Sequence, residues 1–179
     1  MNQAYSEAGE PLERPLSSKA SIAGALHGSS HVWIWRRKNA GVEVLVQQRA
    51  AIKKTWPNFW DISAAGHMDH GETPLVTAQR ETKEELGITV LTEQLRLLFV
   101  HRQYVVARVE PRAIENEFQF VYALNLNNER YTLQKEEVSE TKWVTLDVLK
   151  QMILDGKIVP HGEVYFAELF LQLERMVES

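Results

Sequence analysis

The chain has 179 residues, a length that suits one domain and leaves little room for a second. Apolar residues make up 44% of it and charged residues 25%, which is ordinary globular composition with enough apolar mass for a core. The formal net charge of −4 argues against duplex nucleic acid as a partner, because its binders normally present a basic surface. A small phosphorylated substrate is not excluded, because a bound divalent metal can reverse the local field.

The lack of cysteine excludes disulfides, thiolate metal sites and cysteine nucleophiles. The first residues do not form the apolar segment of a secretory signal, and no apolar run approaches the roughly 18 residues of a membrane span. We therefore expect a cytoplasmic protein with no membrane partner.

Residues 1–17 are polar and contain Gly9, Pro11 and Pro15. This composition predicts an extended or flexible lead-in with a turn at Gly9. No repeat, low-complexity tract or linker follows it, so residues 18–179 are expected to form a single domain.

The next segments have the pattern of a hairpin followed by a loop. Strands are predicted over residues 31–36 and 42–48, joined by a turn at residues 39–41. Residues 50–60 are expected to form a loop, and residues 61–65 a short strand.

A central helix is predicted to begin at Thr73, a good N-cap residue followed by Pro74, which suits the first helical position. Gly87 stands where a left-handed residue is needed, so the helix is expected to end before it. The residues expected to face the core are Leu75, Ala78, Thr82 and Leu86.

Three further strands and two helices complete the predicted order. They are strands at residues 95–104, 117–126 and around 138–144, a helix from Thr145 or Asp147 to before Gly156, and a helix over roughly residues 163–177. Because strand-helix-strand repeats are few, this order predicts an α/β or α+β fold with a mixed sheet and helices on its faces.

Three acidic side chains share one face of the central helix. Glu81, Glu84 and Glu85 are spaced i, i+3 and i+4, so they span roughly 100° of arc. Like charges at this spacing repel, and a divalent cation such as Mg²⁺ compensates for the repulsion through oxygen ligands. The alternative is a solvated charged face on which Arg80 pairs with Glu84.

The spacing around these acids resembles the Nudix box. The matching residues are Gly66, Glu72 after five residues, Arg80-Glu81 after seven more, Glu84-Glu85 after two, and Gly87-Ile88 after one. Thr82 departs from the pattern, because an aliphatic residue is usual in its slot, but it lies on the core side and touches no ligand.

The resemblance implies a Nudix-type α/β/α sandwich with a central mixed sheet. It also implies an enzyme that cleaves the diphosphate bond of a nucleoside diphosphate or related organic diphosphate. The attacking water would be activated by a glutamate and by Mg²⁺, with Mn²⁺ as a substitute. The family further implies a homodimer.

The same resemblance assigns roles to single residues. Glu81, Glu84 and Glu85 are the expected metal ligands and catalytic groups, and Gly66 brings the backbone close to the metal and can offer its carbonyl. Arg80 would orient a glutamate by a charge-assisted hydrogen bond. An acid such as Glu72 is electrostatically favoured before the helix, where it can tie down the loop.

Further similarity, over about residues 25–145, points to the branch of the family closest to isopentenyl-diphosphate isomerase. It rests on Gln47-Gln48-Arg49, Lys53, Trp56-Pro57, Trp60-Asp61, Ser63-Ala64-Ala65-Gly66-His67 and Glu115-Asn116-Glu117. In the isomerases an Arg and a Lys four residues later grip the substrate diphosphate, which implies that role for Arg49 and Lys53. The alternative is that both are surface charges. Trp56 is expected to stack on the substrate, with core packing as its alternative.

Those isomerases also bind a metal through histidines and two glutamates. Four of the five ligand positions match, at His31, His67, Glu115 and Glu117. The fifth falls on Gly24, and His27 is nearby but out of register. Glu115 and Glu117 are therefore predicted metal ligands. Otherwise His67 contacts substrate phosphate and His31 is a satisfied strand histidine.

Two other functions remain beside hydrolysis. Isomerase activity is disfavoured, because a Cys that handles a proton in the isomerases is Ala65 here. A catalytically silent binding module is disfavoured by the intact acids. The sequence does not determine the substrate, whose specificity is expected in loops such as 50–60 and 101–116.

Overall fold

The computed structural model describes residues 1–39, 41–107, 113–127 and 130–178. The strands are β1 (Asn2–Tyr5), β2 (Pro11–Leu16), β3 (His27–Lys38), β4 (Gly41–Arg49), β5 (Trp60–Asp61), β6 (Ala64–His67), β7 (Leu95–Ala107), β8 (Ala113–Asn125) and β9 (Val138–Thr145). The helices are α1 (Ser18–Ile22), α2 (Pro74–Leu86), α3 (Leu146–Leu154), α4 (Glu163–Glu178) and a short 3₁₀ turn, η1 (Thr92–Gln94).

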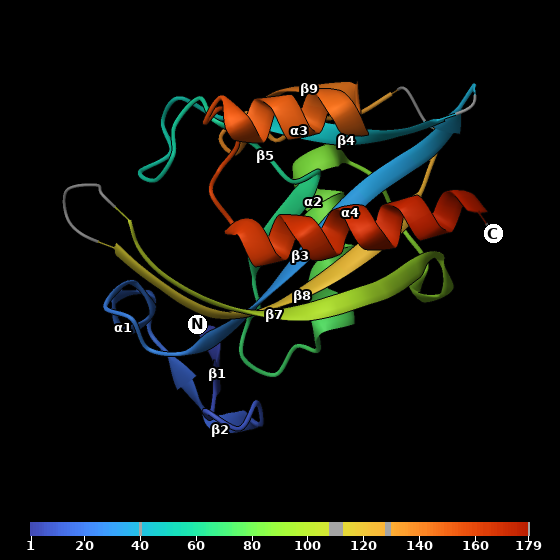
Figure 1. Ribbon diagram of the computed structural model, residues 1–179. Coiled ribbons are helices and arrows are strands. Elements are labelled where there is room, and N and C mark those ends of the chain that lie inside the picture. Colours follow the sequence, from blue (N-terminus) through green and yellow to red (C-terminus); the bar gives the residue numbers. More distant parts are fainter. Residues whose placement is uncertain (40, 108–112, 128–129, 179) are drawn as a thin grey trace.

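The sheet is mixed and is organised around β3. On one side β3 runs parallel to β8, and on the other it pairs antiparallel with β6 and then with β4. The remaining pairs are antiparallel. Strand β7 pairs with β8, both β5 and β9 pair with β4, and β1 pairs with both β2 and β3. The prediction of a mixed central sheet is confirmed (Figure 1).

Strand β3 supplies both hydrophobic cores, because successive residues of a strand point to opposite faces of the sheet. Val32 and Ile34 pack into a cluster that contains Ala78 and Leu86 of α2. Trp33 packs into the other cluster, which α3 and α4 complete with residues such as Leu149 and Leu169.

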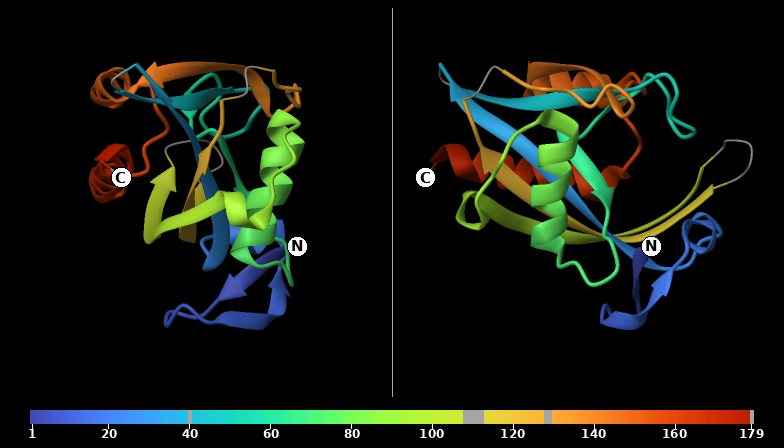
Figure 2. Two further views of the ribbon diagram at one scale, coloured as in Figure 1. Left: turned by 90° about the vertical axis from the view of Figure 1, so that its right-hand side faces the viewer. Right: turned by 180° about the vertical axis from the view of Figure 1, so that it is seen from behind.

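Helices therefore cover both faces of the sheet. Figure 1 shows α3 and α4 in front of it, and the rear view in Figure 2 shows α2 on the opposite face. This arrangement is the α/β/α sandwich expected from the sequence. None of the helices in the described ranges is long and apolar enough to cross a membrane.

Helix α2 has the ends that its sequence predicts. The Thr73 hydroxyl accepts a hydrogen bond from the Val76 N–H, Pro74 is the first helical residue, and Gly87 closes the helix with φ of 70°. Thr82 is fully buried on the core side, where its hydroxyl donates to the Ala78 carbonyl at 2.7 Å. The hydroxyl of Thr82 is thus hydrogen-bonded within the helix, although an aliphatic residue is usual at this position.

Two strand boundaries differ from the prediction in ways that affect the site. Strand β3 begins at His27 instead of residue 31, and β8 begins at Ala113 instead of residue 117. Residues 105–107 and 113–116, expected to belong to a loop, are strand instead, because the β7–β8 ribbon continues with pairs such as Val105 with Glu115. The turn predicted at residues 39–41 includes residue 40, which lies outside the described residues.

The segment at residues 1–17 contains β1 and β2, with φ of 84° at Gly9 in the turn between them. Strand β1 lies against the central sheet, where Ala4 is opposite His27. The Gln3 N–H donates to the Met68 carbonyl at 2.8 Å, so β1 also braces the chain just after β6. A domain boundary at residue 18 stays a prediction.

Candidate functional site

A cavity of about 780 Å³ is lined by side chains from α2, β3, β6, β8 and the segment between β4 and β5. Nine carboxylates line it, from Asp61, Asp69, Glu81, Glu84, Glu85, Glu115, Glu117, Glu136 and Glu137. The Lys and Arg side chains in the lining are only four, from Arg49, Lys53, Lys54 and Arg80. Such an excess of negative charge repels a phosphorylated molecule unless cations bind first.

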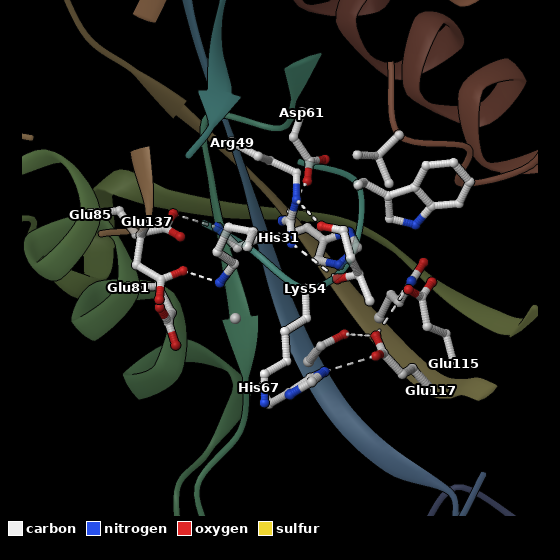
Figure 3. Close-up of a pocket in the computed structure, with 18 of the residues that line it drawn as sticks. His31, Arg49, Lys54, Asp61, His67, Glu81, Glu85, Glu115, Glu117 and Glu137 are labelled. Carbon is white, nitrogen blue, oxygen red and sulfur yellow. Dashed lines mark hydrogen bonds and ion pairs between the residues drawn. The ribbon is translucent and has the colours of Figure 1, made fainter. Parts of the chain in front are cut away.

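The α2 acids and the β8 acids approach the cavity from different sides. In Figure 3, Glu81 and Glu85 lie on the left of the cavity, and Glu115 and Glu117 lie on the right. His67 is at the lower end of the view, between the two groups. The structure thus brings the predicted ligands to one cavity, but in two groups.

Gly66 permits the close contact between β6 and α2. A Cβ atom at this position would overlap the carboxylate of Glu81, with both carboxylate oxygens and the carboxyl carbon inside van der Waals contact. The glycine is therefore required by the space that Glu81 occupies. The backbone of Gly66 thus lies next to that carboxylate.

Arg80 ties the loop before α2 to the acids of the helix. Its Nε and Nη2 atoms donate to the two carboxylate oxygens of Glu72, at 2.9 and 3.0 Å. Its Nη1 donates to Glu81 at 2.6 Å and to Glu84 at 3.2 Å, and its Nη2 also donates to the carbonyl of His67 at 3.0 Å. Arg80 therefore forms charge-assisted hydrogen bonds to Glu72, Glu81 and Glu84, and offsets the repulsion between Glu81 and Glu84.

Glu85 is the most enclosed of the three α2 acids. Its Oε2 atom accepts from the Ala65 backbone N–H at 3.0 Å and from the side-chain amide of Gln47 at 3.1 Å. Both donors use the same oxygen, so Oε1 is left for another ligand. Glu84, in contrast, has a side chain that is 51% exposed and lies at the rim.

Burial makes Glu81 and Glu85 harder to ionise when no cation is bound. Burial and the charge of Glu81 raise the pKa of Glu85 to about 8, against the opposing hydrogen bonds from Ala65 and Gln47. Burial also raises the pKa of Glu81, although Arg80 opposes the shift. Oxygen ligands of this kind suit Mg²⁺, whose charge would stabilise the ionised forms.

The register of the sheet builds a second group of ligands. His27 lies opposite Glu117 on β8, and Ser29 lies opposite His67 on β6. As a result, Nε2 of His67 is 3.0 Å and Nε2 of His27 is 3.4 Å from the same Glu117 oxygen. Ser29 donates to the other oxygen at 2.7 Å.

This second group has the chemistry of a metal site. Ligand atoms of His27, His67 and Glu117 all lie within 4.8 Å of one another. Nδ1 of His27 is 2.8 Å from the Ala25 carbonyl, so Nδ1 carries a hydrogen, and in the neutral ring Nε2 has a lone pair to offer to a metal. The Nε2 atom is buried with no hydrogen-bond partner among the described residues. Two imidazoles and a carboxylate suit Zn²⁺, Mn²⁺ or Fe²⁺.

His31 does not belong to this group in the structure. Its Nδ1 lies 3.0 Å from the Tyr165 hydroxyl, which accepts the indole N–H of Trp33 at 3.0 Å. The hydroxyl can donate its hydrogen to Nδ1 of a neutral ring, so His31 is satisfied as a neutral strand histidine. Burial and the charge of His161 lower its pKa to about 3, consistent with the neutral form.

Arg49 and Lys53 line the cavity, and each already has an anionic partner. Nη1 of Arg49 donates to Asp61 at 3.1 Å, and Lys53 forms an ion pair with Glu137. Trp56 lines the same region with its ring against Phe59, at a centroid distance of 5.2 Å. Its backbone has φ of 50°, which is an uncommon conformation for a bulky residue.

The comparisons with known proteins agree with this geometry. The family model of the NUDIX domain matches residues 26–166. The chain belongs to the Nudix family.

Proteins similar in sequence include a Nudix hydrolase and an isopentenyl-diphosphate isomerase, the two kinds of protein that the resemblance implied. Nudix hydrolase 3 of Arabidopsis thaliana is 38% identical over 144 residues, which are 77% of this chain and 18% of the plant protein. This chain therefore spans less than a fifth of that relative. An isopentenyl-diphosphate Δ-isomerase of Aliivibrio fischeri is 31% identical over 150 residues, 82% of this chain and 81% of the isomerase.

A crystal structure supports the fold. A protein of Deinococcus radiodurans superposes with a TM-score of 0.71 at 20% identity, over 96% of this chain and 98% of that one. Membership of the Nudix family and likeness to its isomerase branch are thus confirmed, and the substrate is not determined by these similarities.

Three site residues of this Nudix chain were missed at the level of sequence. The fifth ligand position of the isomerases falls on Gly24, which left His27 out of register; because β3 begins at His27, His27, Ser29 and His31 share one face of the strand. Gln47 belongs to the isomerase-like pattern, but the sequence indicates no role for it. His161 lines the cavity from the segment between α3 and α4, where no motif or periodicity indicates it.

Proposed function

We propose that this chain is a divalent-metal-dependent hydrolase that cleaves the diphosphate bond of a small organic diphosphate. The observation that carries the proposal is the excess of carboxylates in one cavity, centred on Glu81 and Glu85 beside Gly66. Without bound cations this cavity repels diphosphates, and with them it attracts diphosphates. A cytoplasmic location and a homodimer stay predictions.

Glu81, Glu84, Glu85 and the Gly66 carbonyl would hold Mg²⁺, with Mn²⁺ as a substitute. The ion would polarise the phosphoryl oxygens and lower the pKa of a water molecule. The protein's own part is to fix the acids: Arg80 holds Glu81, and Ala65 and Gln47 hold Glu85. A glutamate of this set would take the proton from the attacking water.

A second cation would be held by His27, His67 and Glu117, with Glu115 beside them in the cavity lining. The nitrogen ligands distinguish this position from the oxygen-only position at α2. Elemental analysis of protein purified without chelators tests it. We expect a transition metal that His67→Ala reduces, while the exposed His70→Ala leaves the metal content unchanged.

The organic part of the substrate is proposed to be polar. Apart from Gly66, the apolar members of the lining are Ile22, Ile52, Trp56, Ala65, Ile114 and Val159, and the rest are polar or charged. An isoprenoid tail would leave many of these polar groups without partners. A nucleoside or sugar diphosphate can hydrogen-bond to them, and Trp56 can stack on a base or sugar ring.

Isomerisation of isopentenyl diphosphate is the alternative that the similarity to the Aliivibrio fischeri isomerase favours. That reaction protonates a carbon–carbon double bond and removes a proton from another carbon. The cavity has the methyl group of Ala65 where the isomerases have a Cys. A methyl group cannot carry a proton, so hydrolysis is the better-supported reaction.

A panel of diphosphates tests the proposal. Nucleoside diphosphates, sugar diphosphates and isopentenyl diphosphate are incubated with the protein and Mg²⁺, and the products are separated by anion-exchange chromatography. We expect phosphate or monophosphate products from at least one polar substrate, and none with EDTA. Dimethylallyl diphosphate formed at enzyme-like rates would contradict the proposal, and so would a complete lack of products with either Mg²⁺ or Mn²⁺.

A further inference from the structure

His161 lies in the wall of the cavity, on the segment between α3 and α4. The residue is 8% exposed, and its ring packs against the rings of His31 and Tyr165, with centroid distances of 5.3 and 5.0 Å. It belongs neither to the α2 acids nor to the group formed by His27, His67 and Glu117. Neither proposed metal site therefore accounts for a buried imidazole in this cavity wall.

The carboxylate of Asp61 holds His161 and Arg49 at the same time. Its Oδ1 is 2.9 Å from Nε2 of His161, and its Oδ2 accepts from Nη1 of Arg49 at 3.1 Å. Burial alone would raise the pKa of Asp61, but His161 and Arg49 lower it to about 2, so the group is an ionised acceptor. Nε2 of His161 must therefore carry a hydrogen, and the imidazole faces other groups through Nδ1.

Both side chains keep unused hydrogen-bonding atoms. Arg49 uses three of its five N–H groups, two toward Thr55 and one toward Asp61. Its other two N–H groups, and Nδ1 of His161, have no hydrogen-bond partner in the part of the chain that the structure describes. The two free N–H groups of Arg49, together with Nδ1 of His161 when that atom carries a hydrogen, are donors that match the oxygens of a phosphoryl group.

Their place in the cavity fits the second phosphoryl group of a diphosphate. In Figure 3, Arg49 and Asp61 lie at the upper end of the cavity, away from His67 at the lower end. A diphosphate held by a cation at Glu81 and Glu85 has a second anionic end that needs donors. Arg49 and His161, both in the cavity lining, supply such donors from two different segments of the chain.

We propose that His161 binds one phosphoryl group of the substrate together with Arg49, whose phosphate-binding role the resemblance already implies, and that Asp61 is the positioning residue that aims both side chains. His161 donates from Nδ1 to a phosphoryl oxygen and from Nε2 to Asp61, so the ring binds as an imidazolium between two anions. The inference rests on the proposed function for the chemistry of the substrate, a diphosphate, and requires no hydrolysis.

Two charged groups lie nearest to His161: Asp61 from β5, which contacts it directly, and Arg49, which binds the same carboxylate. Glu115 from β8 also interacts with it electrostatically, although burial raises the pKa of Glu115. His31 and His101 oppose a positive charge, but burial lowers the pKa of both, which favours their neutral forms. Tyr165 is also uncharged, because burial raises its pKa.

The test measures binding of methylenediphosphonate, a diphosphate analogue whose P–C–P bridge cannot be hydrolysed. Isothermal titration calorimetry with Mg²⁺ gives Kd for the wild type, His161→Ala, His161→Gln and Asp61→Asn. We expect His161→Ala to weaken binding by about tenfold to a hundredfold, the loss typical of one hydrogen bond between charged groups. His161→Gln keeps an amide donor and should recover part of the loss.

Two further measurements separate positioning from general damage. Asp61→Asn should weaken binding about as much as His161→Ala and, with a turned-over substrate, raise KM more than it lowers kcat. His101→Ala is the matched control, because its ring also packs on Tyr165, at 5.6 Å, but does not line the cavity. It should bind the analogue as the wild type does.

Unchanged affinity in both His161 variants, each folded by circular dichroism, would overturn the inference. If His161→Ala does not fold, His161→Gln decides. If the wild type hydrolyses diphosphates but both His161 variants bind the analogue as the wild type does, the role of His161 is overturned and the proposed hydrolysis is not. A wild type that binds the analogue through His161 but hydrolyses nothing would support the inference and contradict the proposed hydrolysis.

Discussion

Arg80 and Glu72 are joined by two parallel hydrogen bonds, of 2.9 and 3.0 Å, which use both oxygens of the carboxylate. Glu72 also accepts from the Asp69 N–H and from the Thr77 hydroxyl, at 3.0 and 2.7 Å. The pair fixes the loop between β6 and α2, and Arg80 then reaches Glu81 from this fixed position. The geometry of the proposed metal site thus depends on a residue that need not touch the metal.

Arg80→Lys should therefore not be conservative. A lysine has no planar fork and cannot bind both oxygens of Glu72 while it contacts Glu81. We expect kcat to fall by about tenfold or more and the Mg²⁺ concentration for half-activation to rise. Arg96→Lys, on the exposed side of β7, is the control. Wild-type kcat and wild-type Mg²⁺ response in Arg80→Lys would show that the paired hydrogen bonds have no role in activity.

Gly66→Ala should displace the Glu81 carboxylate, because the added methyl group would overlap it. The expected result is a loss of about a hundredfold in kcat, the scale of losing a key charge-stabilising group. Gly41→Ala is the matched control, since a Cβ there meets nothing within 4 Å. Equal kcat in the two alanine variants would mean that Glu81 tolerates displacement and would remove it from the proposed ligands.

Stability of the metal-free protein should fall as pH rises. The pKa of Glu85 is raised from an ordinary 4.5 to about 8. The stabilisation that goes with a raised carboxyl pKa is present below about pH 4.5 and is lost as pH rises through about 8. Thermal unfolding in EDTA should therefore show a falling Tm between pH 6 and 9, which Mg²⁺ reverses.

Glu85→Gln should remove this pH-dependent part of the stability, because the amide of the glutamine stays neutral at every pH tested. The comparison is the difference in Tm between EDTA and Mg²⁺ at each pH. A wild type whose Tm in EDTA is the same at pH 6 and pH 9 would contradict the assignment of a buried, unneutralised acid at Glu85.

His31 should destabilise the fold in mild acid. Its pKa is lowered to about 3, so below pH 6.5 the unfolded chain takes up a proton that the folded chain refuses. The free energy of unfolding should fall by about 1.4 kcal/mol for each pH unit from 6.5 down to 3. Urea unfolding at pH 7 and pH 5 should show a loss about 2 kcal/mol smaller in His31→Gln than in the wild type. The exposed His70→Gln should lose as much as the wild type, and equal losses in all three proteins would contradict a neutral buried His31.

Local signals in the sequence were sufficient for α2. Its N-cap, first proline and closing glycine each act within one helical turn, so Thr73, Pro74 and Gly87 fix its ends without knowledge of the rest of the fold. The three acids then share one face because the helix period requires it. The core of the candidate site could be located from these short-range rules.

The second ligand group could not be located in the same way, because it depends on pairing between distant strands. His27 meets Glu117 only through the parallel register of β3 and β8. Sequence periodicity did not indicate the first residues of β3, because His27 and Ser29 are polar although both are buried. The contact of His161 with Asp61 joins positions 100 residues apart and has no local signal at all.

Turnover with and without metal is the most direct test of a metal-dependent diphosphate hydrolase. With a substrate from the panel, EDTA should abolish product formation and Mg²⁺ should restore it. Glu81→Gln and Glu85→Gln should each lower kcat by at least about a hundredfold with the fold intact, whereas the exposed Glu140→Gln should not. Full activity in metal-free buffer, or near-normal kcat in both α2 variants, would contradict the account.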